Sequence, residues 1–404
     1  GFELIYLSGL FWAVLVGPEF WKLGKAFGCV SPGEVLRVAY QNRLVGTTYA
    51  LIACGFLIPY TSVQLTGIGY LFEVLSQGKI TYFQGLLLAT FFIILWTAIA
   101  GLRSVAVTDS LQAGIMMASS LAFVFFFVSR FFGGFANFFR NLEATYPQWL
   151  TVPGNGFFTF RTFVNLSLPW FFFSISNPQV LQRLLVPANL QEMRKTITGF
   201  LGYGFAYTII TVTLGFIALV LLPGLPNPDL ATPRLLLDFP IPSWITLFVV
   251  MGILSAAVST ADSIILTLSS MFLQDILPER VPEKTKLLLA QYAFIPLLCG
   301  TVFFFALGRF NLIALLSVTS SLGLLSVVPT ILGLLTKGGK SPKAAFISML
   351  SGAGIVLAQL AGVNLFHGWT APSTLAVASG VYFLVWTIDS PRSEGQKHIP
   401  RGSQ

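Results

Sequence analysis

Apolar runs of membrane-spanning length recur along the whole chain, and they constrain its fold more than any other feature. A helix crosses the ~30 Å hydrocarbon core with about 20 apolar residues, because each residue rises ~1.5 Å. Such runs lie at 4–20, 44–75, 80–100, 104–129, 161–177, 197–222, 241–273, 287–308, 312–335, 343–364 and 371–388. The sequence therefore predicts an all-α integral membrane protein with about eleven transmembrane helices.

Composition excludes the main alternatives. Only 9% of the residues are charged, against roughly a quarter in soluble domains, so a solvated enzyme is excluded. Runs such as 123–128 and 214–222 are apolar on every face, whereas a β-barrel needs alternating segments. The three cysteines form no metal-binding spacing, and both histidines lie outside the apolar runs.

The basic residues predict the orientation. With the C-terminus in the cytoplasm, 17 of the 23 Lys and Arg residues fall inside, as the positive-inside rule requires. This topology also explains the net charge of +8 without a nucleic-acid partner. We predict one transmembrane domain over 1–388 in a cytoplasmic-type cell membrane, followed by a mobile cytoplasmic tail at 389–404.

The run at 241–273 carries a polar face. Ser255, Ser259, Asp262, Ser263 and Ser270 follow one another at offsets of 4, 3, 1 and 7, which places them along one side of a helix. Small hydroxyl residues also let membrane helices pack closely, so helix packing is one interpretation. A carboxylate among the hydroxyls favours a hydrated or ion-lined face instead.

The run at 161–177 is interrupted by polar residues and proline. Asn165, Ser167 and Pro169 precede an aromatic stretch, and Pro178 follows it. Proline frees backbone carbonyls, which a membrane tolerates only against protein or a water-filled cavity. The pattern predicts either a discontinuous helix of the transporter type or an ordinary proline kink.

Asp109 follows a short predicted cytoplasmic turn and lies about one turn inside the 104–129 helix. It either stabilises the helix N-terminus or serves as a cation way-station. The stretch 333–341 has Leu334 where a P-loop needs glycine, so ATP is not the energy source.

Four stretches together resemble the sodium:solute symporter family, which includes sodium-coupled sugar, proline and pantothenate transporters. The resemblance covers nearly the whole chain, with the stretches in the order that the family has them. They are 30–43, similar to the family's T-x-P-E-F-L…R-Y loop; 101–112, similar to G-G-x-x-A-V-x-W-T-D-x-x-Q; 177–183, which reads N-P-Q-V-L-Q-R; and 256–263, similar to A-x-x-S-T-x-D-S.

The resemblance implies the LeuT-like fold, in which two inverted five-helix repeats surround a central site. Residues 1–130 would form a partial first repeat, 161–335 the second repeat and 343–388 two peripheral helices. Family members have a further broken helix, the first of the first repeat, upstream of the first helix found here. We therefore expect the chain to be N-terminally incomplete.

The resemblance also implies site residues. Ser259 and Thr260 match the family's sodium-binding hydroxyls, Ala256 its carbonyl contributor and Asp109 a carboxylate on the cytoplasmic sodium path. Trp170, Phe173 and Ser174 fall where the family places solute-binding residues. The sugar branch has a lysine where this chain has Gly204, so a sugar-type site is not expected.

The sequence thus predicts a sodium-coupled symporter, not an enzyme, that imports a small polar organic solute by alternating access. Its ligands would be sodium and a solute such as a monocarboxylate, amino acid or pantothenate-like acid. A proton-coupled transporter using Asp262 or Asp109 is the alternative, and a membrane sensor domain is another. An intramembrane hydrolase with these two aspartates as a dyad is disfavoured, because they are expected at different depths.

Overall fold

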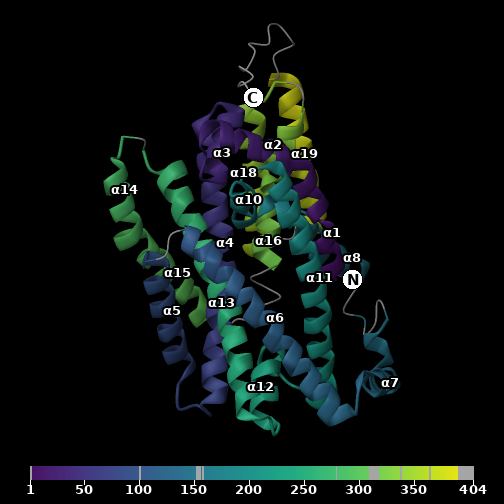
Figure 1. Ribbon diagram of the computed structural model, residues 1–404. Coiled ribbons are helices and arrows are strands. Elements are labelled where there is room, and N and C mark those ends of the chain that lie inside the picture. Colours follow the sequence, from purple (N-terminus) through teal and green to yellow (C-terminus); the bar gives the residue numbers. More distant parts are fainter. Residues whose placement is uncertain are drawn as a thin grey trace.

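The computed structural model describes residues 2–99, 102–151, 156, 159–278, 280–308, 318–336, 339–363 and 365–389, and these contain helices but no strand. The helices pack into an elongated bundle with the C-terminus at one end and α12 at the other (Figure 1). Their bounds are α1 Phe2–Ser8, α2 Leu10–Phe27, α3 Pro32–Tyr40, α4 Arg43–Leu75, α5 Tyr82–Ile99, α6 Leu102–Phe132, α7 Phe135–Thr145, α8 Phe160–Phe171, α9 Phe173–Ser176, α10 Pro178–Leu184, α11 Leu190–Leu221, α12 Ala231–Asp238, α13 Ser243–Met271, α14 Glu283–Leu289, α15 Ile295–Leu307, α16 Val318–Leu324, α17 Val328–Leu332, α18 Pro342–Leu360 and α19 Thr370–Asp389.

The apolar runs form the expected helices. Among the residues that the structure describes, eight helical stretches are long and apolar enough to cross a membrane, and two shorter apolar helices, Tyr82–Leu95 and Ser320–Leu335, occupy the third and ninth runs. The run at 161–177 is instead divided among short helices. Asp389, the first residue of the tail predicted at 389–404, is instead the last residue of α19, and residues 390–404 lie outside the described part of the chain. Residues 312–317 of the ninth run also lie outside it.

Local sequence explains where several helices begin. Ser31 caps α3 by accepting a hydrogen bond from the Glu34 amide, and the Glu34 side chain accepts from the Ser31 amide in return. Asn42 and Asn189 cap α4 and α11 in the same side-chain-to-backbone way. These caps satisfy amide groups that the helix itself leaves unpaired.

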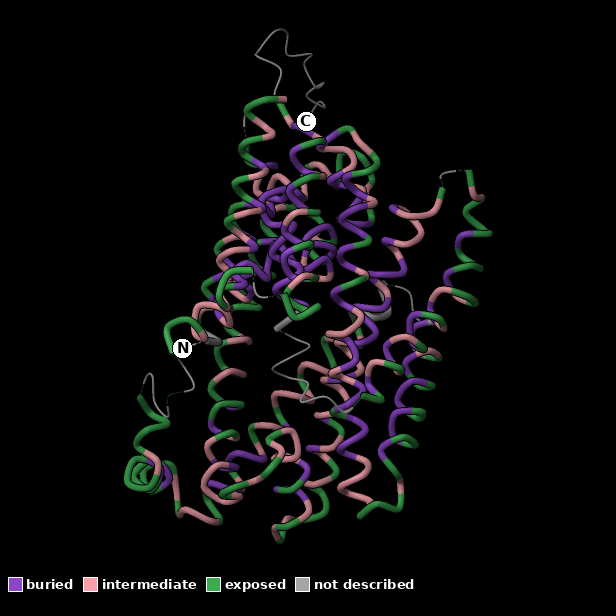
Figure 2. Tube along the Cα trace, turned by 180° about the vertical axis from the view of Figure 1, so that it is seen from behind, coloured by how far each residue is buried: buried purple, intermediate pink, exposed green. Residues whose placement is uncertain are grey.

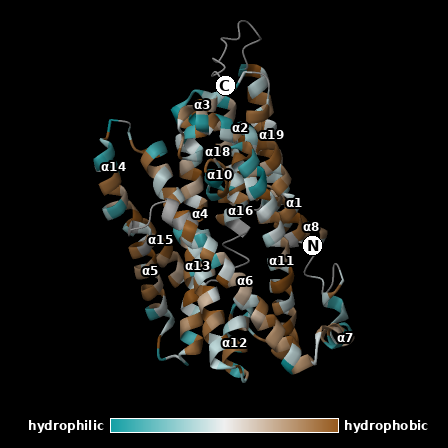
Figure 3. Cartoon of the chain, in the orientation of Figure 1, coloured by the Kyte–Doolittle hydropathy of each residue, from teal (hydrophilic) through white to brown (hydrophobic). Residues whose placement is uncertain are grey.

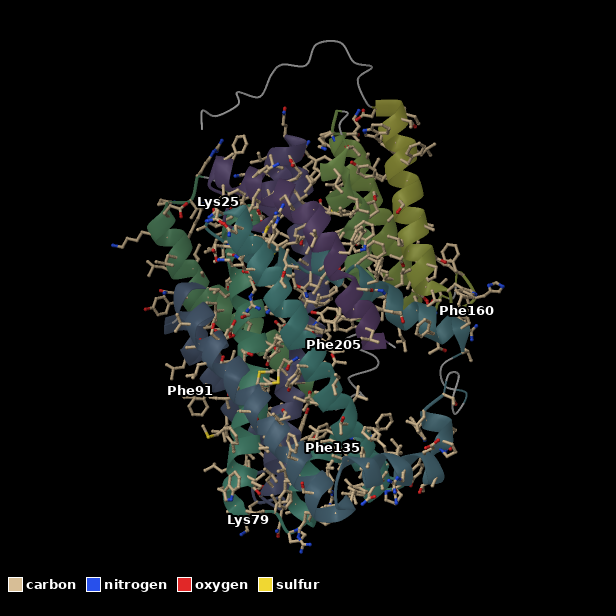
Figure 4. All side chains as sticks on the ribbon, turned by 45° about the vertical axis from the view of Figure 1, so that its right-hand side comes forward. Lys25, Lys79, Phe91, Phe135, Phe160 and Phe205 are labelled. Carbon is tan, nitrogen blue, oxygen red and sulfur yellow. The ribbon has the colours of Figure 1, made fainter. Side chains whose placement is uncertain are left out.

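The outer surface of the bundle is apolar along its length. Figure 3 shows hydrophobic residues along α5, α6 and α11, and hydrophilic ones around α3 and α14 near the C-terminal end. Phe91, 61% exposed, and Phe205, 50% exposed, lie on this outer surface (Figure 4). Such exposure suits helices surrounded by lipid.

The buried core lies mainly in the half of the bundle nearer the C-terminus (Figure 2). On α13, which also packs against α4, Gly252 permits a close approach to α6, since an added Cβ would lie 2.0 Å from the Ser119 hydroxyl oxygen. Small residues allow membrane helices to pack at this distance. α13 is thus packed closely against α6 and also contacts α4.

Candidate functional site

The predicted sodium-binding residues lie in the middle of α13. Ser259 and Thr260 are half-buried, and the Ser259 hydroxyl donates to the Ala256 carbonyl at 3.2 Å. A carbonyl and a hydroxyl oxygen therefore lie side by side on one turn of the helix. Oxygen atoms of this kind are the ligands that hard cations prefer.

A cavity of about 240 Å³ borders this turn of α13. Ala256 and Ala257 form part of one wall, and α4 supplies Gln64, Thr66 and Tyr70 to the other. Asp229, in the short helical turn Pro228–Leu230, also lines it. The cavity thus combines apolar surface with a few polar groups, as small-molecule sites do.

Three polar contacts join Asp109, Arg183 of α10 and Ser263 of α13 to one another. Oδ2 of Asp109 lies 2.5 Å from Nη2 of Arg183 and accepts a hydrogen bond from the Ser263 hydroxyl at 3.1 Å. Arg183 also donates to the Ser263 hydroxyl oxygen at 2.7 Å. Ser263 lies one helical turn beyond Ser259, so the carboxylate approaches α13 next to the predicted sodium residues.

The position of Asp109 within its helix differs from the prediction. The structure describes α6 from Leu102, so Asp109 lies about two turns inside the helix, roughly 10 Å from its start, rather than one. The field of a helix terminus fades within the first turn. Stabilisation of the helix N-terminus is therefore not its role, and the contacts with Arg183 and Ser263 define its environment.

Asp262 is fully buried on α13, and neither of its carboxylate oxygens has a hydrogen-bond partner among the described residues. Oδ1 of Asp109 is also buried without such a partner. A buried ionised carboxylate is costly unless a cation or hydrogen bonds compensate it. A proton or a cation would therefore stabilise each of these two carboxylates.

The interrupted fifth run is a discontinuous helix rather than a kinked one. Its breaks fall at Phe172, between α8 and α9, and at Asn177, which has extended backbone angles and caps α10 through the Gln179 amide. Pro169 lies inside α8, and both breaks fall within the stretch from Asn165 to Pro178 that the sequence marked as interrupted. Pro178 occupies the first turn of α10, where a missing amide hydrogen costs nothing.

The predicted solute-binding residues belong to an aromatic cluster at these breaks. The ring centroids of Trp170 and Phe173 lie 4.8 Å apart, and Tyr6 of α1 meets each at 5.7 Å. Ser174 is buried and donates to the Gly9 carbonyl at 2.6 Å. The lining of the cavity beside Ala256 includes neither ring and does not include Ser174.

A family profile described as "Sodium:solute symporter family" matches residues 2–352. The chain belongs to the sodium:solute symporter family. This symporter is therefore a multi-pass membrane transporter, not an enzyme, and it couples the movement of a solute to sodium.

Two curated relatives come from Bacillus subtilis (strain 168). The symporter is 23% identical over 356 residues to the "Uncharacterized symporter YhjB", a match covering 84% of this chain and 70% of the relative. It is 24% identical over 219 residues to the "Uncharacterized symporter YodF", which covers 54% of this chain and 44% of the relative. The second match thus spans less than half of that relative.

A solved structure shares the fold. It is described as the substrate-bound outward-open state of a Na+-coupled sialic acid symporter. The TM-score is 0.72 at 19% identity, and the match covers 94% of this chain and 83% of the other. The LeuT-like fold predicted from the sequence is therefore confirmed.

Sequence reasoning missed the contribution of α4 to the cavity of this symporter. Gln64 and Thr66 are polar residues within an apolar run, a signal that the sequence already carried. Tyr70 and Asp229 gave no such signal, because an interfacial tyrosine and a loop aspartate are ordinary in membrane proteins. Only packing brings them to the cavity.

Proposed function

We propose that the symporter imports a small polar organic solute together with sodium by alternating access, with its C-terminus in the cytoplasm of a cell membrane. The carbonyl of Ala256 and the hydroxyls of Ser259 and Thr260 would bind the sodium ion. The observation that carries this proposal is the position of Ala256, which lines the 240 Å³ cavity while its carbonyl lies 3.2 Å from the Ser259 hydroxyl. A hard cation would thus find oxygen ligands beside a space that water and solute can enter.

The cavity supports a compact solute. Its volume of about 240 Å³ is below the ~300–1,000 Å³ of pockets for drug-sized ligands. Its polar groups, chiefly the Gln64 amide and the Asp229 carboxylate, would orient the solute by hydrogen bonds. We propose that the aromatic cluster of Trp170 and Phe173, with Ser174 beside it, contributes a second wall when the discontinuous helix moves.

Asp109 would serve the sodium ion on its way to the cytoplasm. Its hydrogen-bond partner Ser263 lies one turn of α13 beyond Ser259. Oδ1 of Asp109 has no hydrogen-bond partner among the described residues. The Arg183 guanidinium occupies the other oxygen and would have to give way for an ion to bind both. The inward electrochemical gradient of sodium supplies the energy for uptake, and its electrical part is about 2.3 kcal/mol per charge for each 100 mV of membrane potential.

The test is the sodium dependence of solute uptake by the full-length protein in liposomes, with a panel of labelled monocarboxylates and amino acids. Ser259→Ala and Thr260→Ala should each raise the sodium concentration for half-maximal uptake. Ser269→Ala is the matched control, because its buried hydroxyl bonds to the Ile265 carbonyl of its own helix. Unchanged sodium dependence in both site variants would contradict the proposal.

A proton that moves together with sodium is a second proposal, favoured by Asp262. Protonation would remove the cost of burying this carboxylate without hydrogen-bond partners. Sodium-driven uptake measured with and without an inward pH gradient tests this proposal, since only a co-transported proton makes uptake respond to the gradient. Asp262→Asn keeps the shape but cannot ionise, so it should abolish a pH gradient's ability to drive uptake if Asp262 carries the proton.

A further inference from the structure

A second cavity lies beyond the first, toward the end of the bundle opposite the C-terminus. It measures about 500 Å³ and is lined by the last turn of α4, the turn that follows it, and α12. Gly78, which precedes the labelled Lys79 in the sequence, belongs to this lining (Figure 4). The charge distribution of the loops predicts that this end is extracellular.

The two cavities follow the same face of α4. Val63, Gly67, Tyr70 and Val74 line one or the other at offsets of 4, 3 and 4, the spacing of a single helix face. Tyr70 is the residue common to both linings. The cavities are thus consecutive along one wall, and the tyrosine stands where they meet.

Neighbouring elements hold Tyr70 at this junction. Its side chain is 7% exposed, and its ring lies 5.1 Å from that of Tyr82. The Tyr82 hydroxyl donates to the Ala306 carbonyl of α15 at 2.7 Å, and Gly69 leaves room for the Tyr82 ring. Tyr70 therefore packs on a ring that is itself anchored to a third helix.

The charges along the two cavities are unequal. Glu73 and Arg234 line the outer cavity, and Asp229 lines the inner one. Arg234 lies 3.6 Å from Asp238, which offsets part of its positive charge. With Asp238, the charged side chains of this region are three carboxylates and one guanidinium, so their sum is negative whichever of them pair with one another. A low-dielectric cleft strengthens the resulting field.

We propose that the two cavities are successive chambers of one access route, that Tyr70 is the constriction between them, and that Glu73 and Asp229 make the route selective for small cations. The cation is either sodium or the ammonium group of a solute. The inference rests on the proposed function only in treating the inner cavity, beside Ala256, as part of the transport path.

Thiol labelling tests the route without sodium or uptake. Gly67→Cys places a thiol in the inner chamber, where an added Cβ meets no atom within 4 Å. The full-length protein, with Cys29, Cys54 and Cys299 replaced by alanine, is labelled in detergent with small methanethiosulfonate reagents. Lys79→Cys is the matched control, because Lys79 is an exposed turn residue that lines neither chamber.

The constriction predicts slow labelling at position 67 and fast labelling at position 79. Tyr70→Ala should raise the rate at 67 several-fold and leave the rate at 79 unchanged, while Tyr70→Phe, which keeps the ring, should change neither. Equal rates at 67 and 79 with Tyr70 present, or no labelling at 67 in the Tyr70→Ala protein, would overturn the constriction.

The charges predict that a cationic reagent reacts at position 67 about three to ten times faster than an anionic reagent of similar size. Asp229→Asn and Glu73→Gln should each reduce this ratio, and an unchanged ratio in both variants would refute the selectivity. At constant ionic strength, slower labelling in sodium chloride than in N-methylglucamine chloride assigns the route to the ion. Slower labelling in methylammonium chloride than in N-methylglucamine chloride assigns the route to a solute's ammonium group. If neither sodium nor methylammonium slows labelling at position 67, the proposed cation selectivity is overturned.

These labelling rates do not depend on the coupling of solute transport to sodium. A protein that labels as expected but shows no sodium-dependent uptake would refute the proposed function and leave the route standing. The reverse outcome would refute the route alone.

Discussion

Arg183 of α10 and Asp109 of α6, 74 residues apart in sequence, meet at 2.5 Å between Nη2 and Oδ2. The contact joins the discontinuous helix to a long helix of the bundle, and the Ser263 hydroxyl of α13 bonds to both partners. Three elements are thus held together at one point by two charges and one hydroxyl. Any motion that separates α10 from α6 must break this contact.

Removing either charge should therefore favour separation of α10 from α6. The Arg183 side chain is 49% exposed, so solvent screens the pair and its contribution is about 1 kcal/mol. Arg183→Gln and Asp109→Asn should each alter uptake, with the double variant no worse than the more severe single one, because both lose the same contact. Initial uptake rates in liposomes measure this, and strictly additive effects would show that the two residues act separately.

Replacing Gly9 by any residue with a Cβ should destabilise the protein. An added Cβ would lie 2.1 Å from the Phe171 carbonyl oxygen, a backbone atom that cannot rotate away. We expect Gly9→Ala to cost about 1–3 kcal/mol, because α1 and α8 must move apart. Thermal unfolding of the purified protein checks this. Gly55→Ala is the control, since its Cβ meets no atom within 4 Å and helical alanine is favoured.

The buried contact between Ser31 and Asp275 should stabilise the helical turn Phe272–Ile276, which follows α13. The Ser31 hydroxyl lies 3.0 and 2.9 Å from the two carboxylate oxygens of Asp275, which is 2% exposed. Ser31→Ala should cost ~2 kcal/mol or more, since it removes a helix cap and a partner of a buried carboxylate. Thr159→Ala removes an exposed cap from α8 and should cost less. Equal losses of thermal stability in both variants would argue against the Asp275 contact.

Cys29 should be a slow nucleophile at neutral pH. Burial, reinforced by the negative charge of Glu34, raises the pKa of this thiol to about 11. Since the thiolate is the reactive form, alkylation by iodoacetamide should rise with pH up to pH 10 without a plateau. A protein with Cys54→Ala and Cys299→Ala isolates this thiol for the measurement. A plateau near pH 8.5 would contradict the raised pKa, and Glu34→Gln should move the curve to lower pH.

The helical architecture followed from the sequence because length and hydrophobicity alone decide which segments can cross a membrane. The runs at 44–75 and 371–388 correspond within a residue or two to α4 and α19. The sequence analysis assigned no helix to 32–40, although Ser31, Pro32 and Glu34 carry a local capping signal for α3. The assignments of Ser259, Thr260 and Ala256 to sodium, and of residues 1–130 and 161–335 to two repeats, remain predictions.

Tertiary structure decided the rest. The sequence marked the stretch from Asn165 to Pro178 as interrupted but did not give the positions of the breaks, which fall at Phe172 and Asn177, where α1 and α13 pack against α8 and α10. The cavity beside Ala256 depends on Tyr70 and Asp229, more than 150 residues apart in sequence. Hydrophobicity places a helix in the membrane but not its rotation or its neighbours, which are set by side-chain packing between distant segments. That packing is what brings Arg183 to Asp109 and buries Asp262 without a hydrogen-bond partner in the described chain.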